Sequence, residues 1–164
     1  MIIESILEKC IIHTPYIPLY LDLINYLFPN NEIINDKIKN TSEKIHRDIE
    51  NLEIKGESDY LRLCERNKKL DKQIGYSLLI TELEKNNIIE GKIHPTIDYL
   101  IQTLSECIED ETKYKCVQCL YNILKSFYGD MLLPEGYNQK IKALINEEKT
   151  SKIKFKMMDI LERR

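Results

Sequence analysis

The sequence has no tryptophan, few glycines and prolines, and no long apolar segment. Its five glycines form neither a GxGxxG nor a GxxxxGKS or GxxxxGKT pattern, which excludes the common nucleotide-binding loops. No apolar run approaches the roughly 18 residues that a membrane-spanning helix needs. The opening MIIESILEKC carries Glu4 and Glu8 without a basic flank, unlike a secretion signal. We therefore expect a cytoplasmic protein that binds no nucleotide.

The cysteines are too few and too scattered to predict a disulfide framework or a metal centre. They number five, an odd count, and suit a reducing compartment in which thiols pack as small apolar side chains. Cys116 and Cys119 of CVQC supply two of the four ligands that structural zinc needs, and Cys107 and His94 are the residues that would complete the site. Because the pair lies in a strongly apolar segment, we predict packing thiols instead. With no recognisable nucleophile motif either, we predict no metal, no cofactor and no enzymatic activity.

Residue usage is uneven among chemically similar side chains. There are 26 isoleucines but one valine and one alanine, and 19 lysines but five arginines. This pattern indicates an AT-rich genome, such as that of a giant virus or a parasite. If the chain is viral, the host cytoplasm is the expected location. The net charge of −3 argues against a surface that is basic throughout, and leaves room for a local basic patch.

Apolar residues recur every three or four positions along almost the whole chain, and no alternating strand pattern is present. The clearest stripe comprises Ile97, Leu100, Ile101, Leu104 and Ile108. A second stripe comprises Ile6, Leu7, Cys10 and Ile11, and a third comprises Leu19, Leu23, Ile24 and Leu27. The sequence predicts eight helices, with short connections at 14–18, 29–31, 55–58, 86–92, 109–113 and 128–136 and an N-cap at Thr150.

Eight amphipathic helices with short connections form either a closed bundle or a stack of antiparallel helix pairs. Around Val117, a second apolar face of Cys116, Ile123 and Phe127 adjoins the main stripe. Such a helix is covered on two sides, as interior helices of a solenoid are. We therefore predict an all-α, HEAT-type α-solenoid, with residues 1–164 as a single domain.

The segment KTSKIKFKMMDILERR, at 149–164, combines an apolar stripe with several basic residues. Ile153, Met157, Ile160 and Leu161 share one side of a helix, whereas Phe155 and Met158 fall on the opposite side. Lys152, Lys156 and Arg163 share a flank, spaced to meet a phosphate backbone or an acidic partner. A solvated charged face is the alternative. The aromatic ring of Phe155, on the side opposite the apolar stripe, requires either a neighbouring repeat or a partner to cover it.

Four segments resemble the middle domain of eukaryotic translation initiation factor 4G, a HEAT-repeat domain. ILEKCIIHTPYIPLYLDLINYL, at 6–27, resembles its early helix pair with its Pro and Tyr. NEEKTSKIKFKMMDILERR is similar to its closing signature, in which basic residues, Ile, Phe and Met precede Asp-Val-Leu-Asp-Leu-Arg. IGYSLLITELEKNNII, at 74–89, resembles a Gly-containing stretch that ends in Glu-Leu, and CLYNILKSFYGDML, at 119–132, resembles a Cys-Leu helix. The likeness covers nearly the whole chain, although the family's first helical repeat has no counterpart.

The resemblance implies a scaffold in translation initiation that binds and stimulates a DEAD-box RNA helicase of the initiation factor 4A type and touches RNA. Carried over by position, the helicase contacts are Leu79, Met131 and Phe155, with core packing as the alternative for Leu79 and Met131. The RNA contacts are Lys152, Lys154, Lys156 and Arg163. No tyrosine heads an intact cap-binding-protein motif of the YxxxxLΦ type. Two alternatives are a direct RNA-binding helical module and a related HEAT adaptor in splicing or mRNA decay.

Overall fold

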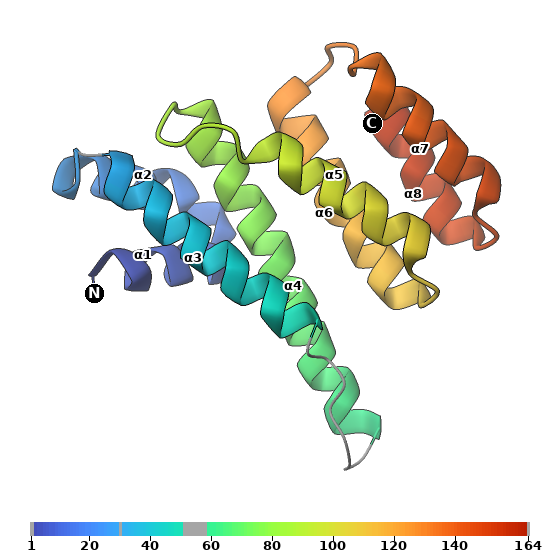
Figure 1. Ribbon diagram of the computed structural model, residues 1–164, viewed down its shortest axis with the longest axis horizontal. Helices are drawn as coiled ribbons and strands as arrows, with labels where there is room; N and C mark the ends of the chain where they lie inside the picture. The colour runs from blue at the N-terminus through green and yellow to red at the C-terminus, as the bar shows by residue number, and fades with distance from the viewer. Residues whose placement is uncertain (1, 30, 51–58, 164) are drawn as a thin grey trace. The chain divides into compact units, whose positions relative to one another are not determined.

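The computed structural model describes residues 2–29, 31–50 and 59–163, and every regular element within them is helical (Figure 1). The helices are α1 (Ile2–Ile12), α2 (Ile17–Leu27), α3 (Asn31–Glu50), α4 (Asp59–Lys85), α5 (Ile93–Glu106), α6 (Asp110–Tyr128), α7 (Glu135–Glu147) and α8 (Ser151–Glu162), with a 3-10 turn η1 (Thr14–Tyr16) before α2. The predicted all-helical class with eight helices is confirmed for this part of the chain. The predicted connection at 55–58 lies outside it. None of the described helices is long and apolar enough to cross a membrane.

The chain divides into two compact units, Met1–Ile89 and Glu90–Arg164, called unit 1 and unit 2 below. Unit 1 contains α1 to α4, drawn from blue to green in Figure 1, and unit 2 contains α5 to α8, drawn from yellow to red. Each unit is described by itself. The single HEAT-type domain over 1–164 stays a prediction.

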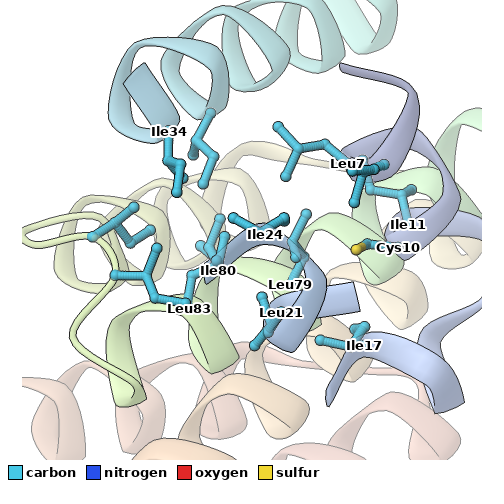
Figure 2. Close-up of a cluster of buried hydrophobic side chains, with 14 of the residues drawn as sticks. Leu7, Cys10, Ile11, Ile17, Leu21, Ile24, Ile34, Leu79, Ile80 and Leu83 are labelled. Atoms are coloured by element: carbon cyan, nitrogen blue, oxygen red, sulfur yellow. The ribbon is translucent and has the colours of Figure 1, made fainter. Parts of the chain in front are cut away.

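The core of unit 1 lies where α1, α2 and α3 pack against the second half of α4 (Figure 2). Its labelled side chains are Leu7, Cys10 and Ile11 from α1, Ile17, Leu21 and Ile24 from α2, Ile34 from α3, and Leu79, Ile80 and Leu83 from α4. All of them are buried, so burial of the predicted stripe in α1 is confirmed.

Helix α2 buries only one member of its predicted stripe. Ile24 is buried as predicted, whereas Leu19, Leu23 and Leu27 are exposed. The core receives Ile17 and Leu21 beside Ile24, as Figure 2 shows. The prediction was wrong for the three leucines because α2 is apolar on two sides, and contacts with α1 and α4 decide which side is buried.

Helix α1 approaches α4 so closely at Gly75 that no other residue fits there. A Cβ atom at Gly75 would lie 2.1 Å from the carbonyl oxygen of Ile11 and 2.9 Å from its carbonyl carbon. Both are backbone atoms, which cannot swing aside as the end of a long side chain can. The absence of a side chain at Gly75 is therefore a condition of the α1–α4 packing.

Helix α4 ends in a left-handed turn that fits the predicted connection at 86–92. Asn87 has a positive φ of 58°, a conformation that asparagine tolerates better than most residues. The N–H of Ile88 then donates to the carbonyl oxygen of Leu83 at 2.9 Å. This bond satisfies a carbonyl group of the last helical turn and directs Ile88 and Ile89 into the core of unit 1.

In unit 2, α6 contacts both α5 and α8, and α7 packs against α5 and α8. The buried side chains of α6 are Cys116, Val117, Cys119, Leu120, Ile123 and Leu124. Two-sided burial of this helix, predicted from its second apolar face, is confirmed. Ile108 was predicted as the last member of the α5 stripe, but α5 ends at Glu106 and Ile108 is exposed.

Candidate functional site

Polar contacts at the beginning of α8 join it to the beginning of α6. Thr150 occupies the predicted N-cap position, but its hydroxyl donates to a carboxylate oxygen of Asp110 at 3.1 Å and does not cap its own helix. Glu148 pairs with Lys113 at 3.3 Å and also accepts the backbone N–H of Thr150 at 3.1 Å. The first turn of α8 is thereby held against α6 by two independent links.

The inner and outer sides of α8 agree with the sequence pattern. Ile153, Met157 and Ile160 are buried within unit 2. Phe155 is 64% exposed and Met158 is 37% exposed. The prediction that these two side chains lie opposite the core stripe is confirmed. Unit 2 thus presents an aromatic ring and a thioether on a helix whose other side is packed.

Two lysines of α8 lie over tyrosine rings of α6. The Nζ atom of Lys152 is 4.2 Å from the ring centre of Tyr114, and that of Lys156 is 4.1 Å from the ring centre of Tyr121. Attraction between an ammonium group and an aromatic face is worth about 0.5–1 kcal/mol at exposed sites. These contacts hold two positive charges in a row along the line where the parallel helices α6 and α8 meet. The sequence could not reveal the pairing, because the partners are more than 30 positions apart.

Arg163 is buried and does not join this row of charges, which corrects its predicted role as an RNA contact. It follows α8 in a left-handed conformation, with φ at 47°. Its guanidinium group donates to the carbonyl oxygens of Gly129 and Met131. The ammonium group of Lys125 donates to the carbonyl oxygen of Arg163 at 2.8 Å. Arg163 therefore joins the end of α8 to the turn that follows α6.

Replacing Arg163 with alanine is expected to lower the free energy of unfolding by about 2 kcal/mol, because two carbonyl groups lose a charged donor. Urea unfolding followed by circular dichroism measures the loss. Arg163→Lys should recover little of it, since an ammonium group lacks the planar guanidinium fork. Lys142→Ala, at an exposed position of α7, is the control and should change the value by less than about 0.5 kcal/mol. A full-size loss in the control, or none for Arg163→Ala, would contradict the proposed role.

Met131 and Lys154 occupy different parts of the unit 2 surface. Met131 lies in the turn after α6 and is 63% exposed, so it is accessible to a partner. Lys154 is half-buried. It lies almost opposite Lys156 around α8, since residues two positions apart in a helix are separated by about 200° around its axis. Phe155 therefore has a lysine on each side.

Leu79 is not accessible as a helicase contact, which corrects that expectation. Its side chain is 0% exposed and lies among α1, α2 and α4 in the core of unit 1 (Figure 2). The packing interpretation therefore holds for Leu79. The sequence pattern is compatible with both roles, because a core leucine and a contact leucine follow the same helical periodicity.

Sequence reasoning missed an aromatic cluster that joins α5, α6 and α7. His94 Nδ1 and the hydroxyl oxygen of Tyr137 share a hydrogen bond of 2.8 Å, and the rings of His94 and Phe127 are nearly perpendicular, with their centres 6.5 Å apart. Burial, with smaller contributions from Asp98 and Tyr128, raises the pKa of Tyr137 to about 12. The phenol is therefore neutral at physiological pH and ties the beginning of α7 to that of α5. No local motif marks these residues as partners.

The CVQC thiols are packed inside unit 2. The side chains of Cys116 and Cys119 are buried, which agrees with the predicted packing role. Burial raises the pKa of Cys116 to about 12, with further contributions from Cys119 and Cys107. A thiol that stays protonated is a poor nucleophile and a poor metal ligand. The part of the chain that the structure describes contains no group of three or more His, Cys, Asp or Glu side chains placed to hold a metal ion.

The candidate functional site is called the α8 face and comprises Phe155 and Met158 with Lys152, Lys154 and Lys156. It combines exposed apolar groups with ammonium groups, and Asp159 and Glu162 follow Phe155 by four and seven residues on the same side of the helix. Its two ends are fixed to α6 by Thr150 and Arg163. No protein-family model, curated protein or solved structure matches the chain.

Proposed function

We propose that this chain is a non-catalytic scaffold in translation initiation that binds and stimulates a DEAD-box RNA helicase of the initiation factor 4A type. The observation that carries the proposal is the α8 face, since the segment with the most specific resemblance to initiation factor 4G also presents an exposed aromatic ring among lysines. The proposed location is the cytoplasm, or the host cytoplasm if the gene is viral.

The helix contacts support a HEAT-type stack of antiparallel pairs as the architecture of this scaffold. Each successive pair is in contact: α1 with α2, α3 with α4, α5 with α6, and α7 with α8. Within unit 2, α5 also packs on α7 and α6 on α8, which is the relation expected between neighbouring repeats. Unit 1 has the corresponding contacts of α1 with α3 and of α2 with α4.

The chemistry of the α8 face suits a protein partner with an acidic, partly apolar surface. Aromatic residues and methionine are enriched in protein interfaces. Phe155 provides buried area on binding, and the lysines on both sides steer an acidic partner and set its orientation. Met131, also exposed on unit 2, is the second proposed helicase contact.

Affinity capture with a purified type 4A helicase tests the proposal directly. Phe155→Glu should weaken capture at least tenfold, because it removes an apolar anchor and repels an acidic partner. Met131→Glu should weaken it less. Tyr60→Glu, at an exposed aromatic position of α4 in unit 1, is the matched control and should leave capture unchanged. Failure of the parent protein to bind the helicase would refute the proposal, and capture of splicing or decay factors from a host extract would favour the related adaptor.

Direct RNA binding is a second candidate, and the row formed by Lys152 and Lys156 over Tyr114 and Tyr121 favours it. This candidate predicts an affinity for single-stranded RNA that falls steeply with salt. Replacing both lysines with glutamine should reduce the slope of log K against log salt by about 1.4, roughly 0.7 for each phosphate of a single strand that is no longer neutralised. Fluorescence anisotropy between 50 and about 200 mM salt measures the slope. An affinity that does not depend on salt would exclude this candidate.

A further inference from the structure

Unit 1 contains a cavity of about 340 Å³ that is lined by residues of α1, α3 and α4, three helices labelled in Figure 1. This volume is near the lower end of the range for small-molecule sites, about 300–1,000 Å³, so it suits a ligand much smaller than a nucleotide. The cavity walls combine the two isoleucines in the last turn of α1 with charged side chains of both signs. Its chemistry therefore depends on how those charges are matched.

The charged side chains of the cavity do not cancel one another. They are the carboxylates of Glu4 and Glu8 and the ammonium groups of Lys37, Lys44 and Lys72. Glu4 and Lys37 form an ion pair of 2.8 Å, and Lys37, with a smaller contribution from Lys44, lowers the pKa of Glu4. Glu8, Lys44 and Lys72 form no ion pair with any other residue that the structure describes. One negative and two positive charges in the cavity walls are therefore unmatched.

Charged residues of opposite sign adjoin these three in the sequence but do not line the cavity. They are Lys9, Glu43 and Asp71. In a helix, each is turned by about 100° from the residue beside it, so it belongs to another side. These neighbours reduce the electric field at the cavity, but they do not occupy the positions from which a ligand would bond to the cavity walls.

A ligand that matches the three groups carries one ammonium group and two carboxylates. Its ammonium group would pair with Glu8, and its carboxylates would pair with Lys44 and Lys72. A dicarboxylate without an amino group would leave Glu8 facing negative charge, and a neutral amino acid would leave one lysine unmatched. The isoleucines at the end of α1 offer an apolar wall to the methylene groups between the charges.

We propose that the cavity of unit 1 binds a free α-amino acid with an acidic side chain, for which glutamate is the probe. At neutral pH this molecule has the required single ammonium group and two carboxylates. Glu8, Lys44 and Lys72 are exposed, so each contact stays hydrated and contributes little, and the expected Kd is about 1 mM. The inference does not rest on the proposed function, since the cavity belongs to unit 1 and the α8 face to unit 2.

Titration of the isotope-labelled full chain with glutamate, followed by its backbone amide signals in NMR spectra, tests the site. Signals around Glu8, Lys44 and Lys72 should shift together and give a single Kd of about 1 mM. Glutarate lacks the ammonium group and glutamine lacks the second carboxylate, so each should bind about threefold more weakly, the effect of one exposed ion pair. Absence of a saturable shift at these three places up to about 20 mM glutamate would overturn the inference. Glutarate that binds as tightly as glutamate would also overturn it.

Substitutions separate the role of Glu8 from a simple attraction of anions to lysines. Glu8→Gln should weaken glutamate binding about threefold and strengthen glutarate binding, so that the preference between the two is lost. Lys44→Gln and Lys72→Gln should weaken the binding of both ligands. Lys39→Gln, at an exposed position of α3 outside the cavity, is the matched control and should leave both Kd values unchanged.

All four substituted positions are exposed, so circular dichroism should show that the variants fold. A preference for glutamate that survives Glu8→Gln would overturn the inference, and so would a loss in the Lys39→Gln control as large as that in Lys44→Gln. These titrations contain no helicase or RNA, so their outcome is independent of the proposed function.

Discussion

Replacing Gly75 with alanine is expected to lower the free energy of unfolding by about 3 kcal/mol, the upper part of the range for overpacked cores. The added methyl group would lie 2.1 Å from the carbonyl oxygen of Ile11, far inside contact distance. Helix propensity alone favours alanine over glycine by about 1 kcal/mol, so a loss must come from the steric clash. Relief requires α1 to move away from α4, which opens the core that Cys10 and Ile11 help to form. Urea unfolding followed by circular dichroism measures the change.

Gly136 provides a matched control for this substitution. It lies in the first turn of α7, where an added Cβ atom would meet nothing within 4 Å. Gly136→Ala should therefore leave the protein unchanged or stabilise it by about 0.5 kcal/mol, as expected for a better helix former. If Gly75→Ala behaves like this control, the close contact between α1 and α4 is not present in solution.

Replacing Leu79 with alanine is expected to cost about 3 kcal/mol of unfolding free energy, within the range for buried leucines. The side chain is completely buried among α1, α2 and α4, so its removal leaves a cavity that these helices can fill only in part. Thermal and urea unfolding both measure this effect. The expected result also separates the two roles considered for Leu79, since a contact residue would affect partner binding with little change in stability.

Leu61 in the same helix is the matched control for Leu79. It is exposed, so Leu61→Ala removes the same atoms from α4 without creating a cavity and should change stability by less than about 0.5 kcal/mol. A Leu79→Ala protein as stable as the Leu61→Ala protein would contradict the buried position of Leu79.

Much of the fold was predictable because helix formation is local. The apolar period in α1 and α5 identified most of their buried residues, although not Ile3 or Ile93, and the second apolar face of α6 predicted burial on two sides. The exposure of Phe155 also followed from the sequence, since it lies opposite three buried residues of α8. The α8 stripe itself therefore located the accessible part of the candidate site.

Other residues of the site could not be placed from local patterns. The row of charges depends on Tyr114 and Tyr121 lying beneath lysines of a helix distant in the sequence. Arg163 has the same charge as its predicted RNA-binding neighbours, yet two carbonyl acceptors near the end of α6 draw its guanidinium group inward. A basic side chain near a helix terminus is compatible with either role until the acceptors are known.

By itself, the sequence determined where helices form and which sides of them are apolar, because a period of 3.6 residues is a property of each segment alone. Tertiary structure decided which apolar side is covered. In α2 both sides are apolar, and contact with α1 and α4 buries Ile17, Leu21 and Ile24 while Leu19, Leu23 and Leu27 remain exposed. That choice depends on contacts between segments distant in the sequence, which no single helix encodes.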